Sequence, residues 1–456
     1  MKVVVCVRQG LDGELSPFDA SAYEAALQLT DAEVTLLSMG PQSAQEFLRH
    51  LTRLGAKQAI LLCDPIFAGS DTLATAYALS LAIKKLEPQL VFCGRQTLVG
   101  DTGQTGPMLS VLSGLHLISN VMRIEQIENR ILCTNRQGSR EEVLFPALLT
   151  LERFCDLRLP SILSRPGAVE LWDAKALNAD PRKCGLQGSP TRVLESFENQ
   201  AGKRKCQFIS WEDLPHVIAE ARQKRNVSVP VQDSNKTLTK VCIVGDTPLG
   251  FAQTVSHHIT RLPFASAEAL AAAIQKEAPS AVLWGSDDRS KELAAKVSAL
   301  LGLGLCADCT RLEAEGDTLV MYRPALAGTR IAKIISRTRP AMATVRTEGR
   351  SGDIVVTAGW GVKEQLNAVQ TFADHLGAEL AATRKMVDNG LLPYKMQVGL
   401  TGKTVSPPVY IAAGVSGAVH HIAGMQRAGT VIAINPDPNA PIFEYADYGI
   451  PEEFSK

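Results

Sequence analysis

The sequence predicts an α/β protein with two doubly wound parallel-sheet domains, related by a pseudo-twofold axis, and a smaller third α/β domain. Three observations lead to this fold class. Short apolar segments alternate with helical patterns, which is typical of parallel sheets covered on both faces. The alternation stops after residue 151 and resumes at residue 240. A sequence pattern of the first domain also recurs in the second.

The first 150 residues show the alternation most clearly. Strands are expected at residues 3–7, 34–39, 58–63, 90–93 and 145–151. Helices are expected between them, at residues 20–30, 42–54, 71–86 and 106–112. Because the apolar segments are continuous, we expect both faces of this sheet to be buried.

Residues 152–237 interrupt the pattern with six prolines, a basic cluster at 203–205 and one expected helix at 211–224. This composition is typical of an arm and a linker. Beyond residue 240, strands are expected at 241–244, 281–284 and 341–346, with helices at 265–276 and 291–301. A third set of strands is expected at 354–357, 396–398, 410–413 and 431–435.

An internal repeat supports two related domains. Residues 114–121 (GLHLISNV) are similar to residues 302–309 (GLGLCADC). Residues 146–152 (PALLTLE) are similar to residues 340–346 (PAMATVR). The two offsets, 188 and 194 residues, are nearly equal. The pattern is therefore that of a heterodimer fused end to end.

The composition excludes several classes of function. The 456 residues include 47 basic and 47 acidic side chains, and this balance argues against general nucleic-acid binding. No apolar run reaches the roughly 18–20 residues of a membrane helix, and the first apolar segment is too short for a signal peptide. We therefore expect a cytoplasmic protein without direct membrane insertion. Its ten cysteines should be reduced, and the single CxxC pair, Cys306 and Cys309, should be two buried thiols rather than a zinc site.

Three glycine motifs resemble those of nucleotide enzymes only in part. Residues 302–307 fit GxGxxA but lie after a helix and before a strand, the reverse of the dinucleotide-binding order. Residues 399–404 (GLTGKT) are two residues short of a P-loop. Gly359 and Gly361 follow an expected strand, but the third glycine is missing. A conventional NAD-dependent dehydrogenase is therefore not supported.

Residues 397–449 carry the densest binding signal. Gly414 and Gly417 follow an expected strand directly, and small residues there let a ligand approach the backbone. Ser416 and Gly417 are expected to start a helix whose free N–H groups favour a phosphate. We therefore expect a nucleotide cofactor at the carboxyl ends of the strands. The alternative is that the glycines only form tight turns.

With these residues the chain resembles an electron transfer flavoprotein that has the β subunit first and the α subunit second in one polypeptide. The α-like matches are residues 323–328, 340–346, 397–403, 414–425 (GVSGAVHHIAGM), 433–438 (AINPDP) and 440–449 (APIFEYADYG). The β-like matches are residues 34–41, 67–76 and 100–107 (GDTGQTGP). The resemblance implies a β-like nucleotide-binding domain with its arm (1–190), a linker (191–238), an α-like domain shortened at its N-terminal side (239–347) and an FAD-binding domain (348–456).

The resemblance implies FAD as the cofactor and an electron carrier rather than a conventional enzyme. Thr401 would contact the flavin N5 atom. His421 would lie near the N1/O2 edge, where a positive charge would stabilise the reduced flavin. The other residues that the resemblance places at FAD are Thr357, Trp360, Thr383, Arg384, Gln397, Val398, Gly399, Leu400, Gly414, Ser416, Gly417, Ala418, Val419, His420, Asn435, Asp437 and Asp447.

Three of these positions depart clearly from the family. Trp360 stands where the family usually has an Arg that lies over the flavin ring. Because Trp carries no charge, we predict a lower flavin potential or a less stable anionic one-electron-reduced flavin. Leu400 and His420 each stand where the family usually has Gln.

The resemblance also implies a second nucleotide in the β-like domain. The residues it places there are Met39, Asp64, Asp71, Thr72, Asp101, Gln104, Thr105 and Gly106. Gly106 and Pro107 are expected to begin a helix, because Pro suits the first helical position. Ordinary family members hold AMP at this site, and the electron-bifurcating branch holds a second FAD. Residues 67–75, 100–104 and 185–191 resemble the bifurcating branch more, which favours FAD over AMP.

Residues 156–162 are similar to the family's partner-recognition loop, with Ile162 nearest to its anchoring Leu. The resemblance implies a flavin dehydrogenase, of the acyl-CoA class, as electron donor. A membrane-associated quinone oxidoreductase or a ferredoxin would be the acceptor. Two alternatives are an electron-bifurcating, NADH-oxidising flavoprotein with two FAD, and a non-redox adenine-nucleotide-binding protein that has lost the flavin.

Overall fold

The computed structural model describes residues 1–10, 13–97, 100, 102–128, 130–198, 203–223, 237–326, 330–346, 352–399 and 402–454. The chain forms two compact units. Unit 1 contains Met1–Ser196, Asp233–Leu326 and Ala332–Val345, and unit 2 contains Phe197–Gln232, Ala327–Ile331 and Arg346–Lys456. In the described part of the chain, no helix is long and apolar enough to cross a membrane.

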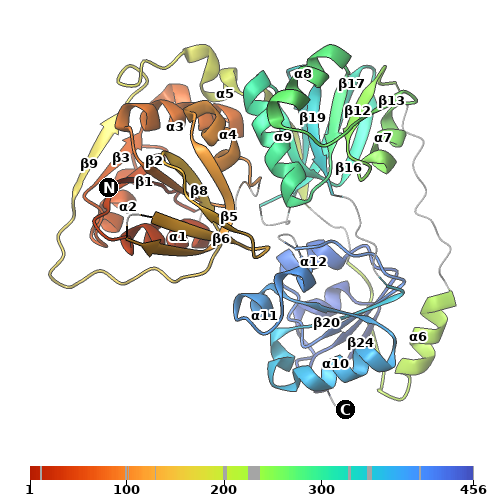
Figure 1. The fold of residues 1–456 in the computed structure, drawn as a ribbon. Helices are drawn as coiled ribbons and strands as arrows, with labels where there is room; N and C mark the ends of the chain where they lie inside the picture. Colours follow the sequence, from red (N-terminus) through yellow and green to blue (C-terminus); the bar gives the residue numbers. More distant parts are fainter. Residues whose placement is uncertain are drawn as a thin grey trace. The chain divides into compact units, whose positions relative to one another are not determined.

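Unit 1 begins with a nine-stranded sheet of order β7-β6-β5-β8-β4-β1-β2-β3-β9 (Figure 1). Its strands are β1 (Lys2–Cys6), β2 (Glu33–Met39), β3 (Gln58–Leu62), β4 (Leu90–Gly94), β5 (His116–Ile127), β6 (Arg130–Asn135), β7 (Arg140–Glu142), β8 (Ala147–Leu151) and β9 (Ala168–Trp172). The pairs β5–β6 and β6–β7 are antiparallel, and the other pairs are parallel.

Helices cover both faces of this sheet. They are α1 (Pro17–Leu27), α2 (Ala44–Thr52), α3 (Thr72–Leu86) and α4 (Thr105–Ser113). Val3 shares a core with Tyr23 of α1 and Leu48 of α2. Its neighbour Val4 points to the opposite face and shares a core with Leu79 of α3. The domain is therefore doubly wound, as predicted.

The antiparallel strands β5, β6 and β7 match no predicted strand. In β5 only Ile118 and Val121 are buried, and its second half is exposed or half-buried, so it lacks the continuous apolar run that marks a strand buried on both faces. β9 lies in the predicted arm and pairs with β3 at the edge of the sheet. The arm is thus partly integrated into the first domain.

The second α/β domain of unit 1 has a parallel five-stranded sheet of order β13-β12-β14-β19-β15. Its elements are β12 (Val241–Val244), α7 (Leu249–Val255), β13 (Ile259–Leu262), α8 (Ala267–Glu277), β14 (Ala281–Trp284), α9 (Asp288–Leu301), β15 (Leu305–Cys309) and β19 (Ala341–Val345). This order repeats β2-β1-β4-β8-β5 of the first sheet. Among the described residues, the second domain has no counterpart of α2 and β3. The described part of the second domain therefore lacks one strand–helix unit that the first domain has.

A four-stranded sheet of order β10-β18-β17-β16 completes unit 1. It contains β10 (Thr191–Glu198), β16 (Arg311–Glu315), β17 (Thr318–Ala325) and β18 (Arg330–Ser336). β10 comes from the predicted linker, so this segment adds a strand to the second domain. Helices α4 and α9, which follow equivalent strands, belong to one shared core, as expected for a pseudo-twofold pair.

The two copies of the sequence repeat contain the same backbone irregularity, one in β5 and one in β15. β5 and β15 each contain an irregularity, at Asn120 and Asp308, where φ is +57° and +53°. The amide of Asn120 donates to Thr150 Oγ1 at 2.9 Å, and the amide of Asp308 donates to Thr344 Oγ1 at 2.8 Å. Only residues that tolerate the left-handed region suit these two positions, and Asn and Asp do so more readily than most.

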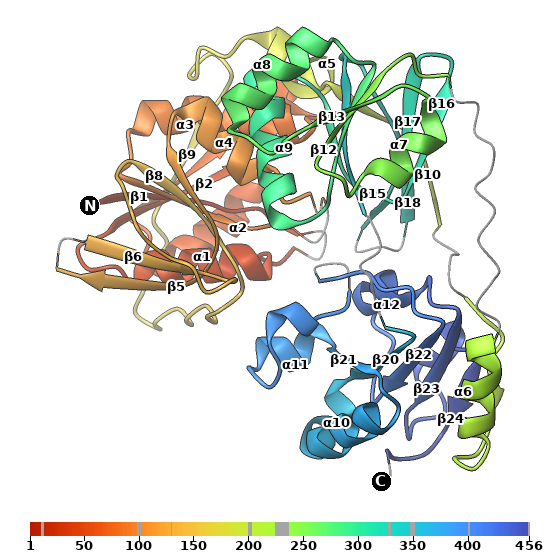
Figure 2. The ribbon, with the colours of Figure 1, turned by 45° about the vertical axis from the view of Figure 1, so that its right-hand side comes forward.

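Unit 2 has a parallel six-stranded sheet of order β11-β24-β23-β22-β20-β21 (Figure 2). Its strands are β11 (Gln207–Phe208), β20 (Ile354–Ala358), β21 (Glu379–Ala382), β22 (Val409–Ala413), β23 (Thr430–Ile434) and β24 (Tyr448–Ile450). Its helices are α6 (Leu214–Gln223), α10 (Leu366–His375), α11 (Arg384–Asp388) and α12 (Val419–Met425). The fold class predicted for the whole chain is therefore confirmed.

Two predictions differ in unit 2. Residues 396–398 are not a strand: Met396 ends a 3₁₀ turn, and Gln397 and Val398 form only isolated bridges. The linker residues 203–223 are part of this unit, because β11 pairs with β24 and Leu214, Val217 and Ile218 of α6 enter its core. Proline-rich and charged composition suggested a linker, but a short edge strand and an amphipathic helix tolerate that composition.

Candidate functional site

The first candidate site lies in unit 2, where loops follow the carboxyl ends of β20 and β22. These loops touch backbone to backbone. A Cβ atom at Gly359 would lie 2.1 Å from Gly414 O, and one at Gly414 would lie 2.7 Å from Val362 N. Gly414 also has φ +62°, which side chains disfavour. Only glycine fits at these positions, as the sequence suggested.

The loop after β22 is fixed by its neighbours. Asn435, just after β23, donates from Nδ2 to Val415 O at 3.0 Å. A Cβ atom at Gly417 would lie 2.3 Å from Ile442 N, so this glycine packs against the segment after β23. α12 begins at Val419, not at Ser416 and Gly417 as predicted, and it has seven residues. Ser416 and Ala418 are exposed in the loop that precedes the helix.

His421 lies in a chain of buried hydrogen bonds. Its Nδ1 atom is 3.0 Å from Val398 O, and its Nε2 atom is 2.9 Å from Tyr410 Oη. Because a carbonyl can only accept, the ring proton belongs on Nδ1, and Nε2 accepts from Tyr410. Thr357 Oγ1 donates to Tyr410 Oη at 2.6 Å. All four groups are therefore satisfied within the protein.

This environment keeps His421 neutral. Its side chain is 5% exposed, and burial lowers its pKa to about 4. Burial raises the pKa of Tyr410, which keeps the phenol protonated as a donor. The positive charge expected at His421 is thus absent at neutral pH. Tyr410 is a functional candidate that the sequence did not reveal, because a Tyr in an apolar strand looks like a core residue.

Among the buried polar atoms of this unit that have no hydrogen-bond partner within the described structure are Thr383 Oγ1 and His420 Nε2. Burial, with a smaller contribution from Arg384, lowers the pKa of His420, so its ring is also neutral at pH 7. An unpaired buried polar group costs about 1–3 kcal/mol. A bound polar ligand would remove this cost, so both residues fit a nucleotide site.

Trp360 opens the loop after β20 and is half-buried. Lys363 Nζ lies 4.7 Å and Lys385 Nζ 4.5 Å from the centroid of its ring. Arg384 pairs with Asp388 within α11. Trp360 itself is neutral, as the sequence predicts, but the ammonium groups of two lysines lie next to its ring.

Gln397 to Gly399 pack closely against Gly402 and Lys403. Gln397 and Val398 are buried, and a Cβ atom at Gly402 would lie 2.2 Å from Gln397 O. Gly399 has φ +149° and faces His420 O, where a Cβ atom would approach to 2.8 Å. Leu400 and Thr401, the predicted N5 contact, lie outside the described residues.

Two predicted residues have other partners. Asp437 is exposed and accepts from the amide of Asn439 at 2.9 Å. Asp447 lies at the amino ends of β23 and β24, where it accepts from Val431 N at 2.8 Å and pairs with Arg204. The structure therefore does not bring Asp447 to the carboxyl ends of the strands.

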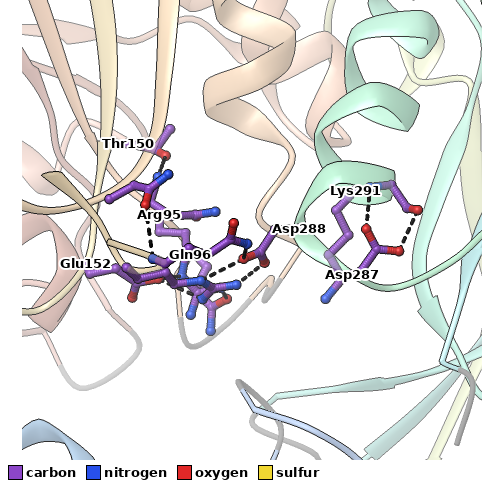
Figure 3. Close-up of polar contacts among 12 residues, drawn as sticks. Arg95, Gln96, Thr150, Glu152, Asp287, Asp288 and Lys291 are labelled. Carbon is purple, nitrogen blue, oxygen red and sulfur yellow. Dashed lines mark hydrogen bonds and ion pairs between the residues drawn. The ribbon is translucent and has the colours of Figure 1, made fainter. Parts of the chain in front are cut away.

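The second candidate site is a pocket in unit 1. Its lining residues are Arg95, Gln96, Thr102, Gly103, Pro107, Ser119, Asn120, Thr150, Asp288, Lys291, Glu292 and Asp308. They come from the end of β4, the start of α4, the two strand irregularities and the first turns of α9. The pocket therefore lies between the two α/β domains of unit 1 (Figure 3).

A buried ion network borders this pocket (Figure 3). Glu152 pairs with Arg95 at 2.7 Å and with Arg136 at 2.8 Å. Arg136 Nε also donates to Asp288 Oδ2 at 2.9 Å, which joins the two domains. Burial alone would raise the pKa of Glu152, but the charges of Arg95 and Arg136 hold it below its usual value. Gln137 adds a hydrogen bond to Asp288 at 3.1 Å.

Two side-chain amides at this end of the sheet have polar atoms without a partner among the described residues. Gln104 is 2% exposed, and neither its Oε1 nor its Nε2 atom has a partner among the described residues. Gln96 Nε2 is also without a partner, while its Oε1 accepts from Arg95 at 2.5 Å. Gln104 directly precedes α4, which begins at Thr105 rather than at Gly106 and Pro107 as expected. These amides fit a polar ligand.

The other predicted residues of this site serve the protein's own structure. Asp64 accepts from Ile66 N at 2.9 Å and from Ala174 N at 3.0 Å. Asp71 caps α3 and accepts from Thr191 N at 2.9 Å, which ties down the arm.

Among the remaining residues, Met39 ends β2, Thr72 starts α3 and Gly106 packs its backbone near Thr150. Asp101 lies outside the described residues. The sequence did not reveal Arg95, Gln96 or Glu152, which stand just after expected strands.

The predicted partner loop is exposed. Ile162 is 97% exposed, and Leu159 and Leu163 are each 89% exposed. Neighbouring exposed apolar side chains are typical of surfaces that bind a partner. In the described part of the chain, no group of three or more potential metal ligands occurs.

Comparisons with known proteins agree with this geometry. Residues 3–146 and 255–350 match the pattern of the electron transfer flavoprotein domain, and residues 350–426 match that of the electron transfer flavoprotein FAD-binding domain. Protein FixA of Azorhizobium caulinodans is 38% identical over 227 residues, which cover 45% of this chain and 81% of that protein.

Two further relatives are named as subunits. The electron transfer flavoprotein subunit alpha of Thermoanaerobacterium thermosaccharolyticum is 35% identical over 231 residues, 40% of this chain and 70% of that protein. The subunit beta of Megasphaera elsdenii is 38% identical over 212 residues, 42% of this chain and 78% of that protein. The chain therefore belongs to the electron transfer flavoprotein family, with β-like and α-like parts joined in one polypeptide.

Proposed function

We propose that this protein is an electron carrier that binds FAD in unit 2. The observation that carries the proposal is the pair of buried atoms without a partner, Thr383 Oγ1 and His420 Nε2, next to the closely packed glycine loops at the carboxyl ends of the strands. These residues lie within the match to the FAD-binding domain. FAD, when bound, supplies one- and two-electron chemistry that no side chain provides.

Each part of the site has a distinct role in this proposal. The 414–418 loop offers backbone groups to the cofactor, and Thr383 and His420 donate or accept hydrogen bonds. Neutral His421, held by Tyr410 and Val398, fixes the helix that follows the loop. Arg384, Gln397, Gly399, Leu400, Thr401, Val419 and Asn435 complete the proposed contacts. Asp437 stays a candidate on resemblance alone.

We infer that the pocket of unit 1 holds a second nucleotide, AMP or FAD. Gln96 Nε2, which has no partner and lines the pocket, supports a polar ligand there, and Gln104, next to the lining residue Gly103, adds an unpaired amide beside it. Thr105 and Gly106 begin the adjacent helix, and the resemblance adds Asp101 as a candidate contact. The sequence motifs favour FAD. A second FAD would make an electron-bifurcating, NADH-oxidising activity the alternative function.

The proposed electron donor is a flavin dehydrogenase, of the acyl-CoA class, and the acceptor is a quinone oxidoreductase or a ferredoxin. The exposed apolar residues Leu159, Ile162 and Leu163 support a docking loop for such a partner. The balanced charge of the chain gives no support for nucleic-acid binding. We place this activity in the cytoplasm.

The visible absorption spectrum of the purified protein tests the proposal. A flavoprotein has the absorption bands of oxidised flavin, and these bands bleach on reduction by a dehydrogenase with its substrate. A colourless protein that contains only adenine nucleotide would contradict electron transfer and support the non-redox alternative. Bleaching by NADH alone would instead favour the bifurcating alternative.

A further inference from the structure

The loop after β20 combines an aromatic ring with two cations. Trp360 follows Gly359, whose backbone touches the Gly414 loop, so the indole stands at the edge where the nucleotide site is proposed. Lys363 comes from the 3₁₀ turn that starts at Trp360, and Lys385 comes from α11. The turn and α11 pack against each other, so one ring receives ammonium groups from two separate elements.

Both contacts are within the range of a cation–π interaction. The ammonium groups lie 4.7 Å and 4.5 Å from the ring centroid, and such contacts are favourable within about 6 Å. Lysine side chains at an exposed surface otherwise sample many rotamers. The indole therefore holds two mobile charges in one place.

The neighbouring charges do not cancel this pair. Glu364 lies 3.6 Å from Lys363 but is 86% exposed, and Asp388 is engaged by Arg384. His420 and His421, the two imidazoles of the nearby loop, are neutral at pH 7 because both are buried. Positive charge at this edge therefore comes from the two lysines and from Arg384, whose charge is paired with Asp388.

We propose that Trp360 positions Lys363 and Lys385 as one cationic platform that favours the reduced, more negative form of the bound flavin. The inference rests on the proposed FAD site and adds its source of charge. It also changes the expectation from the sequence. Trp360 itself is neutral, but it holds the ammonium groups of Lys363 and Lys385 close to the proposed flavin site. Their positive charge opposes the fall in flavin potential that the sequence predicts.

The test is a redox titration of the flavin-loaded protein and of Lys363→Met, Lys385→Met and the double variant. Removing one charge near the flavin should weaken the preference for reduced over oxidised FAD by roughly tenfold. For a two-electron couple this equals a potential lower by about 30 mV, and the double variant should shift further. Trp360→Leu should shift in the same direction, because it releases both lysines.

Two controls separate charge from structure. Lys205→Met removes one exposed lysine beside β11, at the sheet edge opposite β20 and β21, and should leave the potential unchanged. Lys363→Arg and Lys385→Arg keep the charge and the aromatic contact, so these variants should have the wild-type flavin potential. Because the chain has four tryptophans, the emission of each variant before flavin loading is compared with that of Trp360→Leu, and the difference reports whether the lysines contact Trp360.

The outcomes are distinct. Flavin-loaded lysine variants with the wild-type potential would overturn the inference and leave the proposed function intact. An equal shift in the Lys205→Met control would also overturn it, because the effect would then come from net charge. A wild-type protein without bound flavin would contradict the proposed function itself, and this inference with it.

Discussion

At His421, burial and the surrounding hydrogen bonds determine the protonation state of the imidazole ring. Its motif suggested an imidazolium beside the flavin. In the structure, Val398 O accepts from Nδ1, and burial keeps the ring neutral, so that Nε2 accepts from Tyr410. Tyr410 comes from the middle of β22, outside any binding motif, and therefore only the fold reveals its role.

This arrangement predicts an unusual titration. The folded pKa of His421 is about 4, below its ordinary value of 6.5. Between these pH values the unfolded chain binds a proton that the folded chain does not, so His421 contributes stability above pH 6.5 that is lost as the pH falls toward 4. The contribution is up to about 3 kcal/mol at 1.36 kcal/mol per unit.

Residue-resolved NMR of the imidazole is the right measurement. Burial raises the pKa of Asp19 in unit 1 to about 7, and this shift has the opposite effect on stability in the same pH range. A bulk denaturation curve would mix the two effects. We expect the His421 signal to titrate near pH 4. Titration at or above pH 6.5 would contradict the buried hydrogen-bond chain.

At the scale of elements, glycines determine how closely the loops after β20 and β22 approach. Gly414→Ala places a methyl group 2.7 Å from Val362 N at φ +62°. We expect it to destabilise unit 2 by more than about 1 kcal/mol and to reduce flavin content, as measured by denaturation and absorbance.

Gly250→Ala is the control for this prediction. Gly250 lies in α7 with open space around its Cβ position, so alanine should leave unit 1 equally stable or more stable by up to about 1 kcal/mol. A Gly414→Ala protein with normal stability and full flavin content would contradict the close loop contact.

The strands that could be predicted from the sequence are those that are buried on both faces. The continuous apolar strands β1, β3 and β8 were found from composition alone, because both of their faces are covered. The three-residue β24 was not found, because it is short and contains Gly449. Without β24, Asp447 looked like part of the loop after β23, although it stands at the opposite end of the sheet.

At the scale of the molecule, the buried ion network joins the two α/β domains of unit 1. Arg136→Leu leaves Glu152 with one cation fewer and removes a partner of Asp288. Breaking a buried pair costs about 3–5 kcal/mol. We expect thermal unfolding of unit 1 to begin at a clearly lower temperature in this variant.

Arg140→Leu provides a matched control on the same hairpin. Arg140 pairs with Glu125 at 2.6 Å but is 55% exposed, so its loss should cost at most about 1 kcal/mol. Equal melting temperatures for the two variants would contradict a stabilising role for the network.

The two-domain plan was visible in the sequence because both domains need the same strand irregularity next to a threonine. Asn120 with Thr150 and Asp308 with Thr344 preserve this feature even where other residues differ. The arm could not be assigned in this way. The edge strands of the arm and the linker, β9, β10 and β11, are partly polar, and their pairing depends on sheets formed elsewhere in the chain.

The central claim is that one chain holds FAD in unit 2 and a second nucleotide in unit 1. Acid release followed by separation and quantification of nucleotides per chain tests it most directly. The account predicts two nucleotides per chain, at least one of them FAD. It also predicts that Gln104→Leu loses the nucleotide of unit 1 and keeps the FAD of unit 2. A chain that releases no FAD would contradict it.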